Sequence, residues 1–448
     1  MRKHSMHAAR AAVRSAGVYG DSVVDNEALA RLGDVPVALL SDALIDEKVS
    51  SLVLERLKGS GAGLVGGLHG QARFAEARAR IEAVERHKDE VLPMVDRQAR
   101  ELGISVWAIK GLAAEGAYPE RTVRDLGDLD LMVATVDDAV RLTARLRDAG
   151  YDFDNLEWPW VKRSLESGVI YGQFNLNDGA LENRPTIDLH FGGYSVRHCG
   201  FHPLATGERK PGLSYYDIQQ NMPLLVANAA GDHDITTKDL NDFALALRNP
   251  SVDWDQLLRE LEAIKLLGFF KRMAGELDAT PLRPLYRDSV LPPRLRNVRA
   301  ETPAPRVSLM WQRRWAATVR HAYALGARHS YARATVTTLS AARYYWGHRV
   351  VKVRSRAIRP GPRLPRLVNW TCVRLIPAAM VKRLRSGDDG AAVGASFLPV
   401  RGPQRSLSAE LTAIRSPVGD IIRTRLGDFV PAVYHVDDPW QRLNEGAK

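Results

Sequence analysis

Residues 121–133 read RTVRDLGDLDLMV, an apolar run that carries two acidic residues at alternate positions. Leu129 and Leu131, with their apolar neighbours, predict a buried strand. Acidic residues are poor strand formers, and they seldom lie in a core without a partner. Because side chains two positions apart on a strand point to the same face, we expect the carboxylates of Asp128 and Asp130 to project together.

The stretch TIDLHF, at residues 186–191, repeats this pattern, with Asp188 and His190 between apolar residues. If the two strands are neighbours in one sheet, Asp188 joins Asp128 and Asp130, and three carboxylates converge. Such a cluster needs cations to offset its repulsion, and Mg²⁺ binds one or two carboxylates together with substrate phosphates. The pattern predicts a metal site for a triphosphate. Acidic pairs at strand ends are also often solvated or capping, so that interpretation stays open.

Length and composition place the chain among globular proteins of two or three domains. It has 448 residues, of which 45% are hydrophobic and 26% charged. No apolar run approaches the roughly 18 residues that a membrane-spanning helix needs, and residues 1–20 lack the apolar core of a signal peptide. The two cysteines, Cys199 and Cys372, suit a reducing compartment. We therefore expect a cytoplasmic protein.

Charge is divided unevenly along the chain. Residues 291–448 contain 28 basic and 9 acidic residues, whereas residues 1–290 contain 35 basic and 43 acidic ones. Residues 302–387 contain 18 lysines and arginines, several aromatic residues and no acidic residue. This composition is compatible with RNA or another polyanion as a partner. An anionic membrane surface, or the acidic part of the same chain, would also fit the charge.

The periodicity of apolar residues predicts the order of the elements. Helices are expected at about 26–103, with a loop at the glycine-rich residues 59–70, followed by a strand at 104–111, a helix at 137–151, strands at 171–175 and 186–191, and helices at 224–277. This order predicts an α+β fold in which a mixed sheet core is flanked by helical N-terminal and C-terminal domains. The expected divisions are residues 1–103, 104–204, 205–285 and a basic region at 286–448.

The stretch VWAIKGLAAEGAYPERTVRDLGDLDLMV, at residues 106–133, resembles the core of the nucleotidyltransferase-fold (polymerase β-like) superfamily. The closest branch is a group of uncharacterised nucleotidyltransferases that have a Lys-Gly pair, a Tyr-Pro, an arginine and a Gly-Asp-x-Asp run in this order. That branch also carries a third Asp in an Ile-Asp-Leu-His strand, and a helical domain similar to residues 237–258. Abortive-infection-type toxin nucleotidyltransferases, some of which modify tRNA ends, share these elements more loosely. The resemblance covers about residues 26–277.

The resemblance implies a role for nine residues. It implies metal ligands and catalytic carboxylates at Asp128, Asp130 and Asp188, nucleotide-binding residues at Lys110, Gly111, Arg124 and Lys238, and acceptor-binding or orienting residues at His190 and Asp242. Two of these residues could instead have a purely structural role. Arg124 could form an ion pair with Asp125, and Lys238 could form a surface ion pair with Asp242. The chain departs from the superfamily where Lys110-Gly111-Leu112 replaces Gly-Gly or Gly-Ser, so its grip on the triphosphate is expected to differ.

The expected activity is therefore metal-dependent transfer of a nucleoside monophosphate from a nucleoside triphosphate, with release of pyrophosphate. The resemblance implies Mg²⁺ or Mn²⁺ as the cofactor and ATP as the expected nucleotide. Residues 104–204 would form the catalytic core. The acceptor stays open among a small molecule, a peptide or protein, and an RNA end. The alternative hypothesis is a non-catalytic nucleotide- or RNA-binding protein that uses the basic C-terminal region.

Overall fold

The fold is that of a computed structural model, which describes most of the first 300 residues and parts of the remainder. The described residues are 2–18, 26–58, 62–118, 124–153, 159–163, 169–178, 185–196, 200–204, 209–232, 235–280, 293–301, 335, 373–378, 395–397, 405–406, 408–416 and 419–434. Most of the basic stretch at 302–387, and with it the expected polyanion site, lies outside these ranges.

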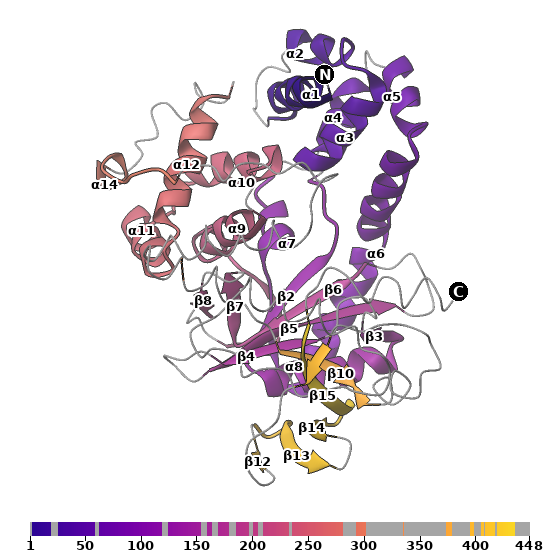
Figure 1. The fold of residues 1–448 in the computed structure, drawn as a ribbon, viewed down its shortest axis with the longest axis vertical. Coiled ribbons are helices and arrows are strands. Elements are labelled where there is room, and N and C mark those ends of the chain that lie inside the picture. The colour runs from indigo at the N-terminus through magenta and orange to yellow at the C-terminus, as the bar shows by residue number, and fades with distance from the viewer. Residues whose placement is uncertain are drawn as a thin grey trace.

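A mixed sheet forms the centre of the molecule (Figure 1). Its central strands are β1 (Ser105–Ala108), β2 (Leu129–Val133), β5 (Ile170–Asp178), β6 (Ile187–Phe191) and β9 (Gly212–Tyr215), in the spatial order β9-β1-β2-β6-β5. Strand β2 runs parallel to β6 and antiparallel to β1, while β9 is parallel to β1. The predicted strands at 129–133 and 187–191 are therefore neighbours. The short strands β3 (Tyr151–Phe153) and β4 (Trp160–Arg163) pair with β5, and β7 (Gly193–Val196) pairs with β8 (Gly200–Pro203) in a separate hairpin.

Strand β2 is buried on both faces, which explains its almost continuous run of apolar residues. Leu129 and Leu131 belong to an apolar cluster that includes residues of α6 (Ala72–Leu102) and α8 (Val136–Asp148). Met132 belongs instead to the cluster of the C-terminal helices. Because alternate residues share a face, Asp130 points to the same side as Met132, toward those helices.

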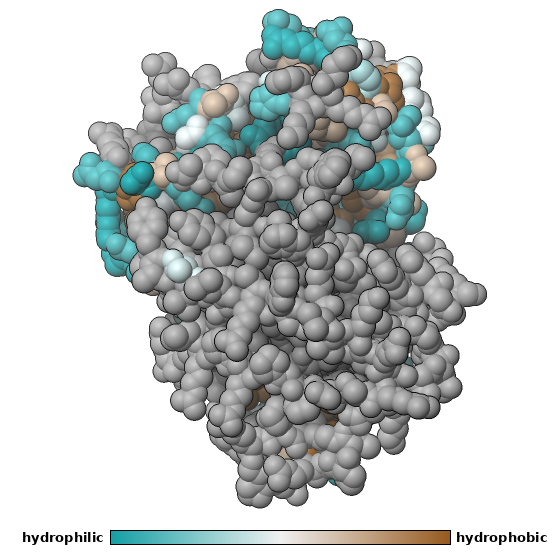
Figure 2. Space-filling model, viewed as in Figure 1, coloured by the Kyte–Doolittle hydropathy of each residue, from teal (hydrophilic) through white to brown (hydrophobic). Residues whose placement is uncertain are grey.

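In the described part of the chain, α6 is preceded by helices that pack around an apolar cluster of their own. They are α1 (Arg2–Gly17), α2 (Asn26–Leu32), α3 (Val37–Glu47), α4 (Ser50–Leu57) and α5 (Ala62–His69). Helix α7 (Lys110–Glu115) follows β1. On the face shown in Figure 2, the surface over α2 and α11 is mainly hydrophilic, as expected for helices with one inward apolar stripe.

The glycine-rich residues 59–70 were predicted to form a loop, and this prediction is wrong for residues 62–69, which form α5. Leu68 is fully buried there, and Leu64 packs against the same cluster. At Gly63 and Gly66, an added Cβ would meet no atom within 4 Å, so these glycines lie on the open side. Tertiary packing therefore offsets a poor helix propensity of about 1 kcal/mol per glycine.

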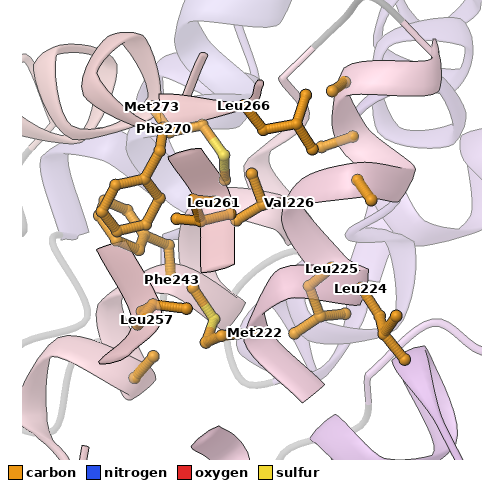
Figure 3. Close-up of a cluster of buried hydrophobic side chains, with 14 of the residues drawn as sticks. Met222, Leu224, Leu225, Val226, Phe243, Leu257, Leu261, Leu266, Phe270 and Met273 are labelled. Atoms are coloured by element: carbon orange, nitrogen blue, oxygen red, sulfur yellow. The ribbon is translucent and has the colours of Figure 1, made fainter. Parts of the chain in front are cut away.

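The C-terminal helices form a compact bundle against the other face of the sheet. They are α9 (Ile218–Asp232), α10 (Thr237–Arg248), α11 (Trp254–Ala263) and α12 (Leu267–Asp278), with the short α14 (Pro293–Arg296) beyond them. Figure 3 shows apolar side chains from α9 to α12 converging, among them Met222, Phe243, Leu261 and Phe270. None of the helices in the described ranges is long and apolar enough to cross a membrane.

The sheet does not stop at residue 204, the expected end of the core. Strand β10 (Val373–Pro377) pairs with β4, and the strands that follow continue the same sheet. These are β11 (Ala395–Phe397), β12 (Arg405–Ser406), β13 (Thr412–Ser416), β14 (Gly419–Thr424) and β15 (Gly427–Tyr434). Phe429 of β15 packs edge-to-face on Phe153 of β3, with ring centroids 5.7 Å apart. C-terminal strands thus share the apolar core of the sheet.

This packing predicts that residues near the end of the chain stabilise the core. Phe429→Ala should lower the free energy of unfolding by about 3–5 kcal/mol, because it leaves a cavity beside Phe153. Arg423→Ala, an exposed change in the neighbouring strand, should leave the unfolding midpoint nearly unchanged. Urea unfolding followed by circular dichroism measures both, and equal midpoints for the two variants would contradict the shared core.

Candidate active site

The pairing of β2 with β6 places two carboxylates side by side. Asp130 lies directly opposite Asp188 in the parallel register, and Met132 lies opposite His190. Asp130, Asp188 and His190 each offer a ligand atom, and these atoms all lie within 4.8 Å of one another. Gln173 of β5 donates a hydrogen bond of 2.7 Å to Asp188 and helps to fix its carboxylate. Charged and polar groups from three adjacent strands thus meet on the face toward the C-terminal helices.

Asp128 lies one residue before β2, in a bend, and not in the strand itself. It is half-buried, and its charge acts on Asp130. Burial, together with the negative charge of Asp130, raises the pKa of Asp128 to about 6. A carboxylate that resists ionisation in this way is stabilised when a cation approaches.

Lys110 supplies one positive charge to this cluster. Its Nζ donates to Asp130 Oδ1 at 2.5 Å and lies 4.9 Å from the ring centroid of Tyr194. Burial alone would lower the pKa of Lys110, but the negative charge of Asp130 raises it well above its usual range. Burial works against the ionised form of Asp130 too, and the charge of Lys110 outweighs it, so the pKa of Asp130 stays below its usual range.

The backbone of Lys110 adopts a left-handed conformation with φ 48°, which is unusual for a residue that has a Cβ. Asn221 of α9 holds this peptide from both sides: its Oδ1 accepts from Lys110 N at 2.7 Å, and its Nδ2 donates to Lys110 O at 2.9 Å. A strained conformation persists only where its surroundings over-determine it. Asn221, which sequence reasoning missed because it lies 111 positions away, does so here.

His190 is buried and lies 3.3 Å from Asp130 through its Nε2. Burial and the positive charge of Lys110 lower the pKa of His190 to about 4, so the ring is neutral near pH 7. Its Nδ1 is buried without a hydrogen-bond partner in the described structure. A neutral imidazole with one nitrogen on a carboxylate is suited to holding or ligating, and not to supplying positive charge.

Arg124 forms a buried, two-pronged ion pair with Asp242 of α10. Its Nε and one terminal nitrogen donate to the two carboxylate oxygens at 3.0 and 2.8 Å, and Tyr118 donates to the same carboxylate at 2.6 Å. Asp125, the alternative partner of Arg124, instead accepts hydrogen bonds from Ser50 and Ser51. Arg124 and Asp242 thus join the segment before β2 to the C-terminal helices.

Gly111 has a packing reason of its own. A Cβ at this position would lie 2.5 Å from a terminal nitrogen of Arg124 and 3.0 Å from a methyl group of Leu126. The missing side chain therefore makes room for the buried guanidinium. Because glycine has no Cβ, the same position would also allow a phosphate to come close to the backbone.

Lys238, at the start of α10, does not pair with Asp242, which is occupied by Arg124. In the part of the chain that the structure describes, its ammonium group forms no ion pair with a carboxylate. Burial lowers the pKa of Lys238, and the positive charges of Arg124 and Lys48 lower it further. The surface ion pair considered for this residue is therefore not formed.

The donor set fits a divalent cation. Oxygen ligands from two carboxylates on adjacent strands are typical of Mg²⁺ and Mn²⁺ sites, and the spacing of Asp130, Asp188 and His190 brings these atoms close enough to share one ion. Burial and the negative charge of Asp130 raise the pKa of Asp128, so a cation bound beside it would favour its ionised form. Lys110 already contacts Asp130 from one side.

Comparison with protein families gives a match over the helices and strands described above. A model described as an uncharacterised nucleotidyltransferase family matches residues 35–275, which is more than half of the chain. The matched range contains the N-terminal helices from α3 onward, the central strands, α9 to α11 and most of α12. Comparisons with curated proteins and with solved structures give no match.

The buried ion pair generates a prediction about stability and its pH dependence. Asp242→Asn should cost about 3–5 kcal/mol at pH 7, because it leaves the guanidinium of Arg124 buried without a counter-charge. Burial works against ionised Asp242, but Arg124 outweighs it and lowers the pKa of the carboxyl. Its contribution to stability is therefore present above the unfolded pKa of about 4 and lost as pH falls through the folded pKa.

Denaturant unfolding of the wild type and of Asp242→Asn between pH 3 and 8 measures this effect. The gap between them should be widest near neutrality and should narrow in acid. Asp148→Asn, a change at an exposed position of α8, serves as the control and should stay within about 0.5 kcal/mol of the wild type. A gap that does not depend on pH would contradict the ionised pair.

Proposed function

Because the chain belongs to the family of uncharacterised nucleotidyltransferases, we propose that it transfers a nucleoside monophosphate from a triphosphate, with ATP as the expected donor, to an acceptor nucleophile. Pyrophosphate is released. The observation that carries the proposal is the register of β2 and β6, which sets Asp130 beside Asp188. The acceptor is a small molecule, a peptide or protein, or an RNA end.

At the α-phosphorus the reaction forms one bond and breaks one, and a proton moves from the acceptor to a base. An acceptor oxygen attacks the α-phosphorus, the bond from that phosphorus to the bridging oxygen of the β-phosphate breaks, and the acceptor proton leaves. Asp188 is our choice for the proton acceptor, because it is only half-buried and lies beside the other carboxylates. Asp128 and Asp130 hold the opposite side of the cluster.

The remaining residues bind and orient. Lys110 faces the carboxylates and is placed to exchange its contact with Asp130 for a phosphate oxygen. Lys238 is assigned to the triphosphate, and His190 to orienting the acceptor or completing the ligand set. Arg124, Gly111 and Asp242 act on the nucleotide indirectly, since their contacts fix the C-terminal helices against the cluster. A divalent cation bound by the carboxylates would offset their charge and hold phosphate oxygens.

The proposal predicts loss of transfer when either central carboxylate is neutralised. Asp130→Asn and Asp188→Asn should each lower the rate by about 10²–10⁴-fold, as expected when a positioned carboxylate is removed from the reacting groups. Label transfer from α-³²P-labelled nucleotides in a cell extract with Mg²⁺ or Mn²⁺ measures the rate. Circular dichroism checks that each variant is folded.

Asp152→Asn is the matched control. Asp152 is an exposed carboxylate on β3 that pairs with Arg147, outside the cluster, so its loss should leave the rate unchanged. Wild-type rates in both cluster variants would rule out catalysis at this site. Label retained on the protein or its acceptor, with equimolar pyrophosphate released, identifies the transferred group as the monophosphate.

A further inference from the structure

The turn between α3 and α4 forms hydrogen bonds at both of its ends, one set to the start of α10 and the other to the segment before β2. Glu47, the last residue of α3, is buried and accepts hydrogen bonds from Thr237 N and Oγ1, both at 2.9 Å. At the start of α4, Ser50 N and Ser51 N donate to Asp125 at 2.8 and 2.9 Å. The only residues between these anchors are Lys48 and Val49.

The anchors bring two lysines together. Lys48 follows Glu47, and Lys238 follows Thr237, so the hydrogen bonds between Glu47 and Thr237 place the two lysines at adjoining positions. The second anchor, Asp125, lies three residues before Asp128. Lys48 therefore stands at the meeting point of the N-terminal helices, α10 and the acidic cluster.

Lys48 holds a backbone conformation that favours another residue type. It ends α3 with φ 55°, the left-handed cap at which glycine or asparagine is usual. A lysine at such a position costs conformational free energy that a glycine would not. Lys48 therefore places a charged side chain at a position that glycine would occupy at a lower conformational cost.

The electrostatic effects of Lys48 agree with its position between Lys238 and the acidic cluster. The positive charge of Lys48 acts on both Lys238 and Asp128, and that of Lys238 also acts on Asp128. After burial and Arg124, the charge of Lys48 is the next cause of the lowered pKa of Lys238. The charges of Lys48 and Lys238 oppose each other, and an anion that contacts both lysines would be attracted by both charges.

We propose that Lys48 and Lys238 together form a two-lysine anion site that binds the terminal phosphates of the nucleoside triphosphate, with Lys48 supplied by the N-terminal helices. This inference rests on the proposed function for the identity of the anion. A polyphosphate matches the site because it is multiply charged and extends away from its reacting α-phosphorus. The acidic cluster then faces the α-phosphate, and the lysines face the β- and γ-phosphates.

Glu47 is the positioning residue of this site. Its carboxylate accepts hydrogen bonds from Thr237 and, at 3.1 Å, from Arg14. The negative charge of Glu47 is therefore offset by Arg14. Arg14 in turn donates to Glu276 of α12 at 3.2 Å. The N-terminal helices are thus tied to the C-terminal bundle at the point where the two lysines adjoin.

Binding of inorganic tripolyphosphate, measured by calorimetry without divalent cations, tests the inference without requiring catalysis. Lys48→Asn removes the charge while keeping a residue that accepts the left-handed conformation, and it should weaken binding by at least about tenfold. Lys238→Met should do the same, and Lys48→Arg should restore binding. The KM for the nucleotide should rise in parallel in the two weakened variants.

Lys265 provides a matched control. It is also a lysine with positive φ, 61°, but it is exposed at the end of α11, so Lys265→Asn should bind tripolyphosphate as the wild type does. Equal affinity in Lys48→Asn and the wild type, or no binding by the wild type, overturns the anion site. Lys48-dependent binding without label transfer would instead leave the anion site standing and refute the proposed function.

Discussion

The parallel pairing of β2 with β6, in the register that sets Asp130 opposite Asp188, is the constraint around which the molecule is arranged. Hydrogen bonds of the ladder fix the two carboxylates at neighbouring positions, and their repulsion must then be offset by groups from elsewhere. Lys110 offsets part of it, and the left-handed backbone of Lys110 is held by hydrogen bonds to Asn221 of α9. The C-terminal helices must therefore be packed against the sheet for Lys110 to offset the charge of the acidic cluster.

Two buried ionic or charge-assisted contacts satisfy that condition. Arg124 and Asp242 join the segment before β2 to α10, and Glu47 joins the end of α3 to the first residue of α10. Each contact contains a buried charge that would be costly if left unpaired. The N-terminal helices, the sheet and the C-terminal helices are three layers, and each contact therefore holds one layer against another. Helix α10 consequently lies at the junction of all three layers, with its N-terminus toward the acidic cluster. Loss of either contact would loosen two layers at once.

Much of the core was predictable because it follows local patterns. Alternation at 129–133 and 186–191 predicted both strands and the face that carries the acids, and the order of motifs predicted the family. Asn221 and Glu47 were not predictable, because their importance comes from partners more than 100 positions away. The partner of Arg124 was open for the same reason. Helix α5 and the pairing of the C-terminal strands with the central sheet were missed, because tertiary packing decides both.

The C-terminal strands show that most of the basic stretch at 302–387 lies between two folded parts of the chain. Before it, Glu301 N donates to Gly268 O beside α12, and after it, β10 pairs with β4 at the sheet. The residues on either side of 302–372 therefore belong to the folded body, one at the helical bundle and one at the sheet. Most of the basic stretch is thus an insertion between two parts of the fold, and its charge is not carried on a C-terminal tail.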